Sequence, residues 1–222
     1  MTRLDLVIFD CDGVLVDSEP IAYEVLSSIL ARLGVSMAPE EVGVRFFGKT
    51  VPQCIELAEE LIGRRIPPDF IAAWREELYS TFRERPVQAV AGVREAVEQL
   101  GAPVCVVSNG PIEKMHTTLG VTELLPLFED RLFSPDLGLP GKPEPDLFLA
   151  AARSVQAQPE HCVVIEDSPG GIRGALAAGM QAYGFTGLPH IDAAALESAG
   201  ARTFASMAEL PGLLGGHGSA NT

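Results

Sequence analysis

Two aspartates, Asp10 and Asp12, follow directly after an apolar run over residues 6–9, and Gly13 comes next. Side chains alternate along a strand, so positions 10 and 12 leave it on the same side. Two neighbouring carboxylates repel each other unless a cation lies between them, and a hard divalent cation with oxygen ligands meets that need. The alternative is that both aspartates only shape a turn, where Asp is common.

Polar residues also follow two later apolar runs. Ser108 and Asn109 come after one of them, and Glu166 and Asp167 come after the other. The carboxyl ends of parallel strands meet at one edge of a sheet, where ligands bind. Lys142 lies between these two sites in the sequence Gly-Lys-Pro-Glu-Pro, and the prolines stiffen its loop. Two acidic pairs, a hydroxyl, an amide and a lysine at one edge predict a site for a metal ion and a phosphate group.

The elements that must position these residues alternate between strand and helix. The apolar runs at residues 6–9, 104–107 and 162–165 lack a period of two, which is typical of strands buried on both faces. Further strands are expected at 131–134 and, as the last one, at 182–185, with helices at 93–100, 111–119, 145–155 and 169–178. This order predicts an α/β fold with a doubly wound, Rossmann-like parallel sheet.

A helical block interrupts this alternation after the first strand. Apolar residues recur every four positions at Ile21, Val25, Ile29 and Leu33, and helical patterns continue over 51–62 and 69–83. The block therefore predicts an inserted all-helical cap over residues 18–86, with the catalytic core formed by 1–17 and 87–222.

Composition restricts the classes of partner. The 222 residues carry a net charge of −14, which argues against nucleic acid or an anionic membrane as a partner. Acidic residues interrupt the N-terminal apolar run, so it does not read as a signal peptide, and no apolar run approaches the ~20 residues of a membrane span.

The four cysteines are scattered, which predicts free thiols, a reducing compartment and a cytoplasmic location. A monomer is expected, with a weak homo-oligomer left open, and residues 215–219 are expected to be mobile.

Four motifs in order give the chain a family resemblance. They are Asp10-Cys11-Asp12-Gly13-Val14, Ser108-Asn109, Lys142-Pro143 and Glu166-Asp167-Ser168. Together they resemble the haloacid dehalogenase superfamily of phosphotransferases. The continuation Asp17-Ser18-Glu19-Pro20 and the helical insertion resemble the branch that holds small-sugar-phosphate phosphatases and β-phosphoglucomutases. That branch has an α/β core and a helical cap.

The resemblance implies roles for the acidic residues. Asp10 is expected to be the nucleophile that forms an aspartyl phosphate. Asp12 is expected to protonate the leaving alcohol and then to accept a proton from water. Mg²⁺ is expected to bind Asp10, Asp167 and the backbone carbonyl of Asp12. Glu166 is either a direct metal ligand or a neighbour of one.

The resemblance also implies a phosphate site. Ser108 and Lys142 are expected to hold the phosphoryl oxygens. Asn109 either donates its side-chain amide to the phosphate or shapes the turn.

Hydrolysis is favoured over phosphoryl transfer between sugars. The mutases of this branch carry a histidine on the first cap helix, where this chain has Ala22, and a cap arginine, where it has Val51. A Mg²⁺-dependent phosphatase acting on a small phosphorylated metabolite is therefore predicted, with a β-phosphoglucomutase-like mutase as the alternative. Dehalogenation is disfavoured because Asp12 is present, and phosphonate cleavage because residues 1–48 contain no lysine. A metal-bound module without activity is a third interpretation.

Residues 43–50 match the P-loop pattern G-x-x-x-x-G-K-[ST]. A P-loop follows a strand, whereas this segment follows a helix start at Pro39, and Thr50 is expected to cap the next helix. Nucleotide hydrolysis is therefore disfavoured, and a solvated face is favoured over a substrate-facing position for Arg45 and Lys49.

The four histidines show no metal-ligand spacing and are expected to be surface or packing residues, at positions His116, His161, His190 and His217.

Overall fold

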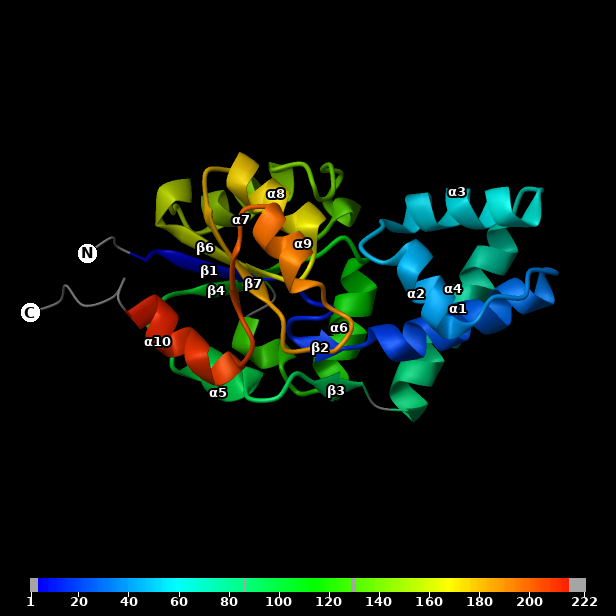
Figure 1. The fold of residues 1–222 in the computed structure, drawn as a ribbon, viewed down its shortest axis with the longest axis horizontal. Helices are drawn as coiled ribbons and strands as arrows, with labels where there is room; N and C mark the ends of the chain where they lie inside the picture. Colours follow the sequence, from blue (N-terminus) through cyan, green and yellow to red (C-terminus); the bar gives the residue numbers. More distant parts are fainter. Residues whose placement is uncertain (1–3, 86, 129–130, 216–222) are drawn as a thin grey trace, which may run out of the picture.

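The computed structural model describes residues 4–85, 87–128 and 131–215. Figure 1 shows a sheet flanked by helices and, beyond the carboxyl ends of its strands, a separate group of helices. Short 3-10 turns connect some elements of the core, at Leu125–Phe128, Pro135–Leu137, Pro159–His161 and Met207–Glu209.

The core is built on a six-stranded sheet with β1 (Leu6–Phe9) near its centre. The strand order is β5-β4-β1-β6-β7-β8, and all neighbouring pairs are parallel. The other strands are β4 (Val104–Val107), β5 (Leu132–Phe133), β6 (Cys162–Glu166), β7 (Gln181–Phe185) and β8 (Arg202–Phe204). The chain builds outward from β1 to one edge and then returns to build the other. The prediction of a doubly wound parallel sheet is confirmed.

The strand expected at residues 182–185 is confirmed as β7, but it is not the last strand of the sheet. The helix α9 (Ala193–Ser198) and the strand β8 follow, and β8 pairs with β7 at the edge of the sheet. The short edge strand contains Arg202 and Thr203, so it has no apolar run to reveal it. The chain then forms α10 (Leu210–Gly215), which includes the first residue of the tail that was expected to be mobile, and residues 216–219 of that tail lie outside the described residues.

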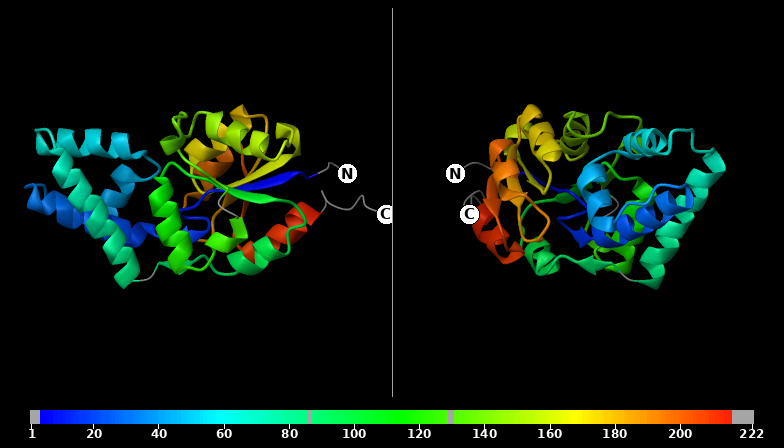
Figure 2. Two further views of the ribbon diagram at one scale, coloured as in Figure 1. Left: turned by 180° about the vertical axis from the view of Figure 1, so that it is seen from behind. Right: turned by 45° about the vertical axis from the view of Figure 1, so that its right-hand side comes forward.

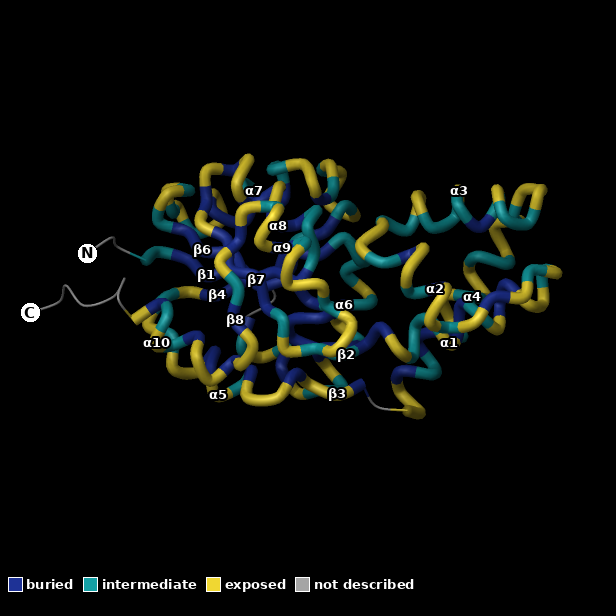
Figure 3. The backbone as a smooth tube through the Cα atoms, in the orientation of Figure 1, coloured by how far each residue is buried: buried dark blue, intermediate teal, exposed yellow. Residues whose placement is uncertain are grey.

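The continuous apolar run of β1 is explained by burial on both faces. Val7 and Phe9 point into one cluster, which is covered by α5 (Val93–Glu98), α6 (Ile112–Val121) and α10. Leu6 and Ile8 point into the other cluster, which is covered by α7 (Asp146–Ser154), α8 (Pro169–Ala177) and α9. Figure 3 shows the strands as the most buried part of the core. No polar face remains in this strand to create alternation.

The helical cap consists of α1 (Glu19–Arg32), α2 (Pro39–Phe46), α3 (Val51–Ile62) and α4 (Pro68–Glu84). Its own apolar cluster includes Leu30 and Val42. Ile29 and Phe82, on other faces of α1 and α4, belong instead to the cluster of the core. The views in Figure 2 show α4 beside α6, and these two helices are in contact. The cap is therefore packed onto the core as well as linked to it.

Two short strands form a ribbon next to the cap. β2 (Val16–Asp17) pairs antiparallel with β3 (Gln88–Ala89). The cap boundaries at residues 18 and 86 stay a prediction.

The P-loop-like segment has the structure of two helices joined by a short turn. Its first residues, from Gly43 to Phe46, are the last turn of α2. Thr50 caps α3, because its side chain accepts a hydrogen bond from the Gln53 N–H while the Gln53 side chain accepts one from the Thr50 N–H. The expected helix start and cap are confirmed. The N–H groups of Phe47, Lys49 and Thr50, which a P-loop would direct at phosphate, donate instead to Gly43 O, Phe46 O and the Gln53 side chain.

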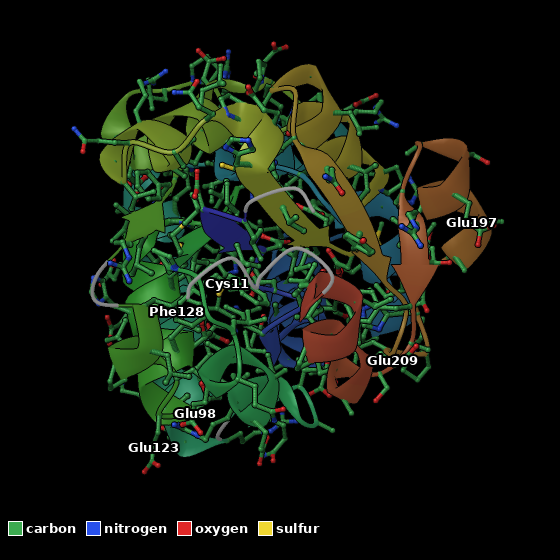
Figure 4. All side chains as sticks on the ribbon, turned by 90° about the vertical axis from the view of Figure 1, so that its left-hand side faces the viewer. Cys11, Glu98, Glu123, Phe128, Glu197 and Glu209 are labelled. Atoms are coloured by element: carbon green, nitrogen blue, oxygen red, sulfur yellow. The ribbon has the colours of Figure 1, made fainter. Side chains whose placement is uncertain are left out.

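The surface of the core carries much of the acidic charge. Figure 4 looks onto the core from the side away from the cap, with Glu98, Glu123, Glu197 and Glu209 around its outside and Cys11 in its interior. The four cysteines are free, as predicted. Within the described part of the chain, no helix is long and apolar enough to cross a bilayer.

Candidate active site

The structure gathers the predicted site residues at the carboxyl ends of the central strands. Asp10 follows β1, Ser108 follows β4, and Glu166 is the last residue of β6. One cavity between the core and the cap is lined by six of the seven predicted residues, which are Asp10, Asp12, Ser108, Asn109, Lys142 and Asp167. The seventh, Glu166, is fully buried behind this lining.

Lys142 joins the first and last acidic pairs. Its Nζ donates to Asp10 Oδ1 at 2.7 Å and also donates to Glu166 Oε1. Burial alone would lower the pKa of Lys142, but the two carboxylates outweigh it and raise that pKa. Burial, with a smaller contribution from Glu166, raises the pKa of Asp10 to about 7 against the opposing effect of Lys142. The lysine is therefore a fixed positive charge beside the expected nucleophile.

Asn109 fixes the loop that carries this lysine. Its Oδ1 accepts a hydrogen bond from Lys142 N at 2.8 Å, and its Nδ2 donates to Lys142 O at 3.1 Å. A Cβ at the preceding Gly141 would lie only 2.6 Å from Asn109 Oδ1, so glycine is needed for this approach. Of the two roles left open for Asn109, the structure shows its amide oriented toward the lysine loop.

Asp12 forms an ion pair with a second lysine, Lys114. Its Oδ1 lies 2.8 Å from Lys114 Nζ and also accepts a hydrogen bond from Ser18 Oγ. Burial lowers the pKa of Lys114, but the Asp12 carboxylate more than reverses that effect. Sequence reasoning missed Lys114, although a lysine in the first turn of a helix that follows a site loop is a usable signal.

Both carboxylate oxygens of Glu166 are engaged by protein groups. Oε1 accepts from Lys142, and Oε2 accepts from Asp167 N at 3.1 Å, Ser168 N at 2.9 Å and Ser168 Oγ at 2.8 Å. A Cβ at Gly171 would lie 1.8 Å from Glu166 Oε1, so the helix α8 can approach only because this residue is glycine. Glu166 therefore anchors Lys142 and the start of α8.

Asp167 has an oxygen that no protein group satisfies. Its Oδ2 is buried and has no hydrogen-bond partner among the described residues. A Cβ at Gly13, whose φ is 80°, would lie 1.8 Å from this oxygen. Oxygens of Asp10, Glu166 and Asp167 lie within 4.8 Å of one another, and burial together with the other two carboxylates raises the pKa of Asp167. These residues fit a hard divalent cation.

The cap side of the cavity is mainly apolar and aromatic, formed by Tyr23, Leu26, Phe46, Phe47, Ile71, Trp74, Leu78 and Tyr79. Two of these residues carry buried polar atoms that have no hydrogen-bond partner in the described part of the chain, the Tyr23 hydroxyl and Trp74 Nε1. Arg75 and Lys49 also line the cavity, and Lys49 is exposed, so it combines the solvated position favoured from the sequence with a place at the cavity wall. Arg45 instead lies outside this lining and pairs with Glu41 on the exposed side of α2.

Ala22 and Val51 lie in the wall of the same cavity. These are the two positions at which the chain departs from the pattern of the mutases. Ala22 and Val51 therefore line the same cavity as Asp10 and Asp12.

His190, expected to be a surface or packing residue, is exposed and also pairs with an acidic residue of the cap. Its Nε2 lies 2.7 Å from Glu19 Oε2, and this carboxylate raises the pKa of His190. The spacing of 171 positions between them hides the pair in the sequence.

Comparisons with known proteins agree with this geometry. The family model for haloacid dehalogenase-like hydrolases matches residues 4–179. A 6-phosphogluconate phosphatase of Escherichia coli K12 is 34% identical over 191 residues, which cover 86% of each chain.

Two solved structures share the whole fold. A haloacid dehalogenase family hydrolase of Deinococcus radiodurans R1, with bound phosphate and sodium, has a TM-score of 0.78 and 34% identity over 98% of this chain and 97% of the other. A predicted β-phosphoglucomutase of Thermotoga maritima has a TM-score of 0.76 and 28% identity over 96% and 99%. The resemblance seen in the motifs is confirmed, and the chain belongs to the haloacid dehalogenase-like hydrolases.

Proposed function

We propose that this protein is a Mg²⁺-dependent phosphatase that hydrolyses a small phosphorylated metabolite through an aspartyl phosphate. The observation that carries the proposal is the arrangement of Asp10 and Asp12, each beside its own lysine, at the floor of one cavity with Asp167. The similarity to a 6-phosphogluconate phosphatase and to a phosphate-bound hydrolase supports the same reaction class.

The proposed cation site consists of the carboxylates of Asp10 and Asp167 and the backbone carbonyl of Asp12. Mg²⁺ bound there supplies positive charge to the transferring phosphoryl group. Glu166 orients this site from behind, because its oxygens already accept hydrogen bonds from Lys142, Ser168 and the Asp167 backbone.

In the first half-reaction, the Asp10 carboxylate attacks phosphorus and the bond from phosphorus to the substrate oxygen breaks. Asp12 gives its proton to that oxygen, so the product leaves as an alcohol. Lys142 and Ser108 bind phosphoryl oxygens during the transfer, and Asn109 holds Lys142 in place.

In the second half-reaction, Asp12 takes a proton from water while the water oxygen attacks phosphorus. The bond from phosphorus to Asp10 breaks, which releases inorganic phosphate and restores the Asp10 carboxylate. One carboxyl thus serves as acid and then as base, as general acid–base catalysis requires.

We propose hydrolysis rather than mutase activity because of the cap wall. Ala22 has no group that can exchange a proton with a sugar hydroxyl, and Val51 cannot bind a second phosphate. The aromatic wall with Lys49 and Arg75 favours a sugar phosphate or a related phosphomonoester as substrate.

The test is a phosphatase screen over sugar phosphates, sugar-acid phosphates, sugar-alcohol phosphates, phosphoglycolate and nucleotides, with and without Mg²⁺. We expect phosphate release that stops after exhaustive chelation and returns with added Mg²⁺. The Asp10→Asn protein is the control for contaminating phosphatases. Full activity after chelation would contradict the metal assignment. Transfer of the phosphoryl group to a hexose phosphate in preference to water would contradict hydrolysis.

A further inference from the structure

The loop after β7 brings His190 from the core to the cap. The Nε2 atom of His190 lies 2.7 Å from Oε2 of Glu19, the first residue of α1. Its ring also lies edge-on to the ring of Phe47, with centroids 6.4 Å apart and an interplanar angle of 76°. We call Glu19, Phe47 and His190 the core–cap contact.

The core holds this loop firmly at both ends. At its start, Thr186 donates from its N–H and its Oγ1 to the carbonyl oxygen of Phe204 in β8, at 2.9 and 3.0 Å. At its end, the Asp192 carboxylate accepts hydrogen bonds from Ala194 N and Ala195 N and caps α9. His190 therefore contacts the cap from a loop whose two ends are hydrogen-bonded to the core.

On the cap side, the contact reaches residues of the cavity wall. Glu19 and Phe47 both line the cavity, whereas His190 lies outside the lining. Glu19 is only 8% exposed, and within the described chain His190 is its one cationic partner at ion-pair distance. Removing the partner of a buried carboxylate destabilises the folded protein strongly, whereas breaking an exposed surface pair changes its stability little.

We propose that His190 is a positioning residue that holds Glu19 and Phe47, and with them the cap wall, over Asp10 and Asp12. The inference rests on the proposed phosphatase function for its kinetic consequence, but not for the contact itself. A substrate that touches the cap needs this wall in place, whereas a small phosphate donor that reaches only the core residues does not.

The kinetic test compares His190→Ala with His161→Ala. His161 is a matched control because its Nδ1 lies 3.2 Å from Asp5 Oδ2 within the core, at the amino ends of the strands and away from the cavity. For the best sugar phosphate of the screen, we expect His190→Ala to lower kcat/KM about tenfold, mainly through KM. For acetyl phosphate, we expect a change of less than about twofold. His161→Ala should leave both substrates unchanged. An equal loss on both substrates, or no loss on either, would overturn the proposal.

A double-mutant cycle tests whether His190 acts through Glu19. In a Glu19→Gln background, His190→Ala should cause little further loss for the sugar phosphate, because the pair is already broken. Losses that simply multiply would contradict a role through Glu19.

Hydrogen exchange provides a readout that needs no substrate. In His190→Ala, we expect amides in the first turn of α1 and in β2 and β3 to exchange at least about fivefold faster than in the wild type or in His161→Ala. If the protein hydrolyses no phosphomonoester but exchange rises in this way, the proposed function fails and the core–cap contact stands. If hydrolysis is present but neither exchange nor KM responds, the core–cap contact fails and the proposed function stands.

Discussion

The two walls of the cavity satisfy their polar groups differently. On the core wall, Asp10 is paired with Lys142 and Asp12 with Lys114, and Asp167 Oδ2, which has no hydrogen-bond partner among the described residues, fits a cation. On the cap wall, among the described residues, the Tyr23 hydroxyl and Trp74 Nε1 are buried without hydrogen-bond partners, and Lys49 and Arg75 form no ion pair.

This difference separates chemistry from recognition. The core wall is organised before any substrate binds, as electrostatic catalysis requires. The cap wall leaves hydrogen-bonding groups that a bound molecule would satisfy, and unsatisfied buried groups are costly without one. Substitutions on the core wall should therefore reduce turnover for every substrate, whereas those on the cap wall should act on some substrates only.

The largest effect is expected from Asp10→Asn. An amide is a poor nucleophile, so kcat should fall by roughly 10³-fold or more for every phosphate donor. Steady-state kinetics with a sugar phosphate and with acetyl phosphate measures this loss, and circular dichroism verifies the fold. Residual activity above about 1% of the wild type would argue against a covalent route.

The next effect concerns Asp167, whose free oxygen we assign to the cation. Asp167→Asn should raise the Mg²⁺ concentration needed for half-maximal activity by about 10- to 100-fold. Glu144→Gln, an exposed acidic residue in the lysine loop, is the control and should change nothing. A metal titration that gives the same midpoint for Asp167→Asn and the wild type would remove Asp167 from the site.

A pair of lysine variants compares the two walls directly. Lys114→Met removes the charge that faces Asp12, so kcat should fall about tenfold or more for all substrates. Lys49→Met removes a charge from the cap wall and should change mainly KM, and only for substrates that reach the cap. Full kinetics for both variants with a sugar phosphate and acetyl phosphate distinguishes these effects. Similar profiles for the two variants would mean that the walls do not differ as proposed.

The smallest effect is expected from Trp74→Phe. This change keeps an aromatic ring but removes the buried N–H, so KM for a sugar phosphate should rise about three- to tenfold while acetyl phosphate is unaffected. Because Nε1 has no hydrogen-bond partner among the described residues, the melting temperature should hardly change. A clear loss of thermal stability with an unchanged KM would show that Trp74 serves packing and not recognition.

The core wall was largely predictable from the sequence because its residues follow strands. A buried strand that ends in Asp10, Ser108 or Glu166 places that residue at a common edge, whatever the details of packing. The roles of these residues stay predictions, but their gathering around one cavity follows from the parallel sheet. Lys142 was found from its proline-flanked loop, whereas Lys114 was missed although it lies in the first turn of the helix that follows the Ser108-Asn109 loop.

The sequence by itself determined the parallel sheet, the helical insertion and the family, because apolar runs and motif spacing are local or ordered along the chain. Only the tertiary structure decided that β8 completes the sheet, that Lys114 faces Asp12, and that His190 meets Glu19. These contacts join residues far apart in the chain, and their side chains are individually typical of a surface. Their partners are set by how the core elements pack on one another and, for His190 and Glu19, by how the cap packs onto the core, which no short segment encodes.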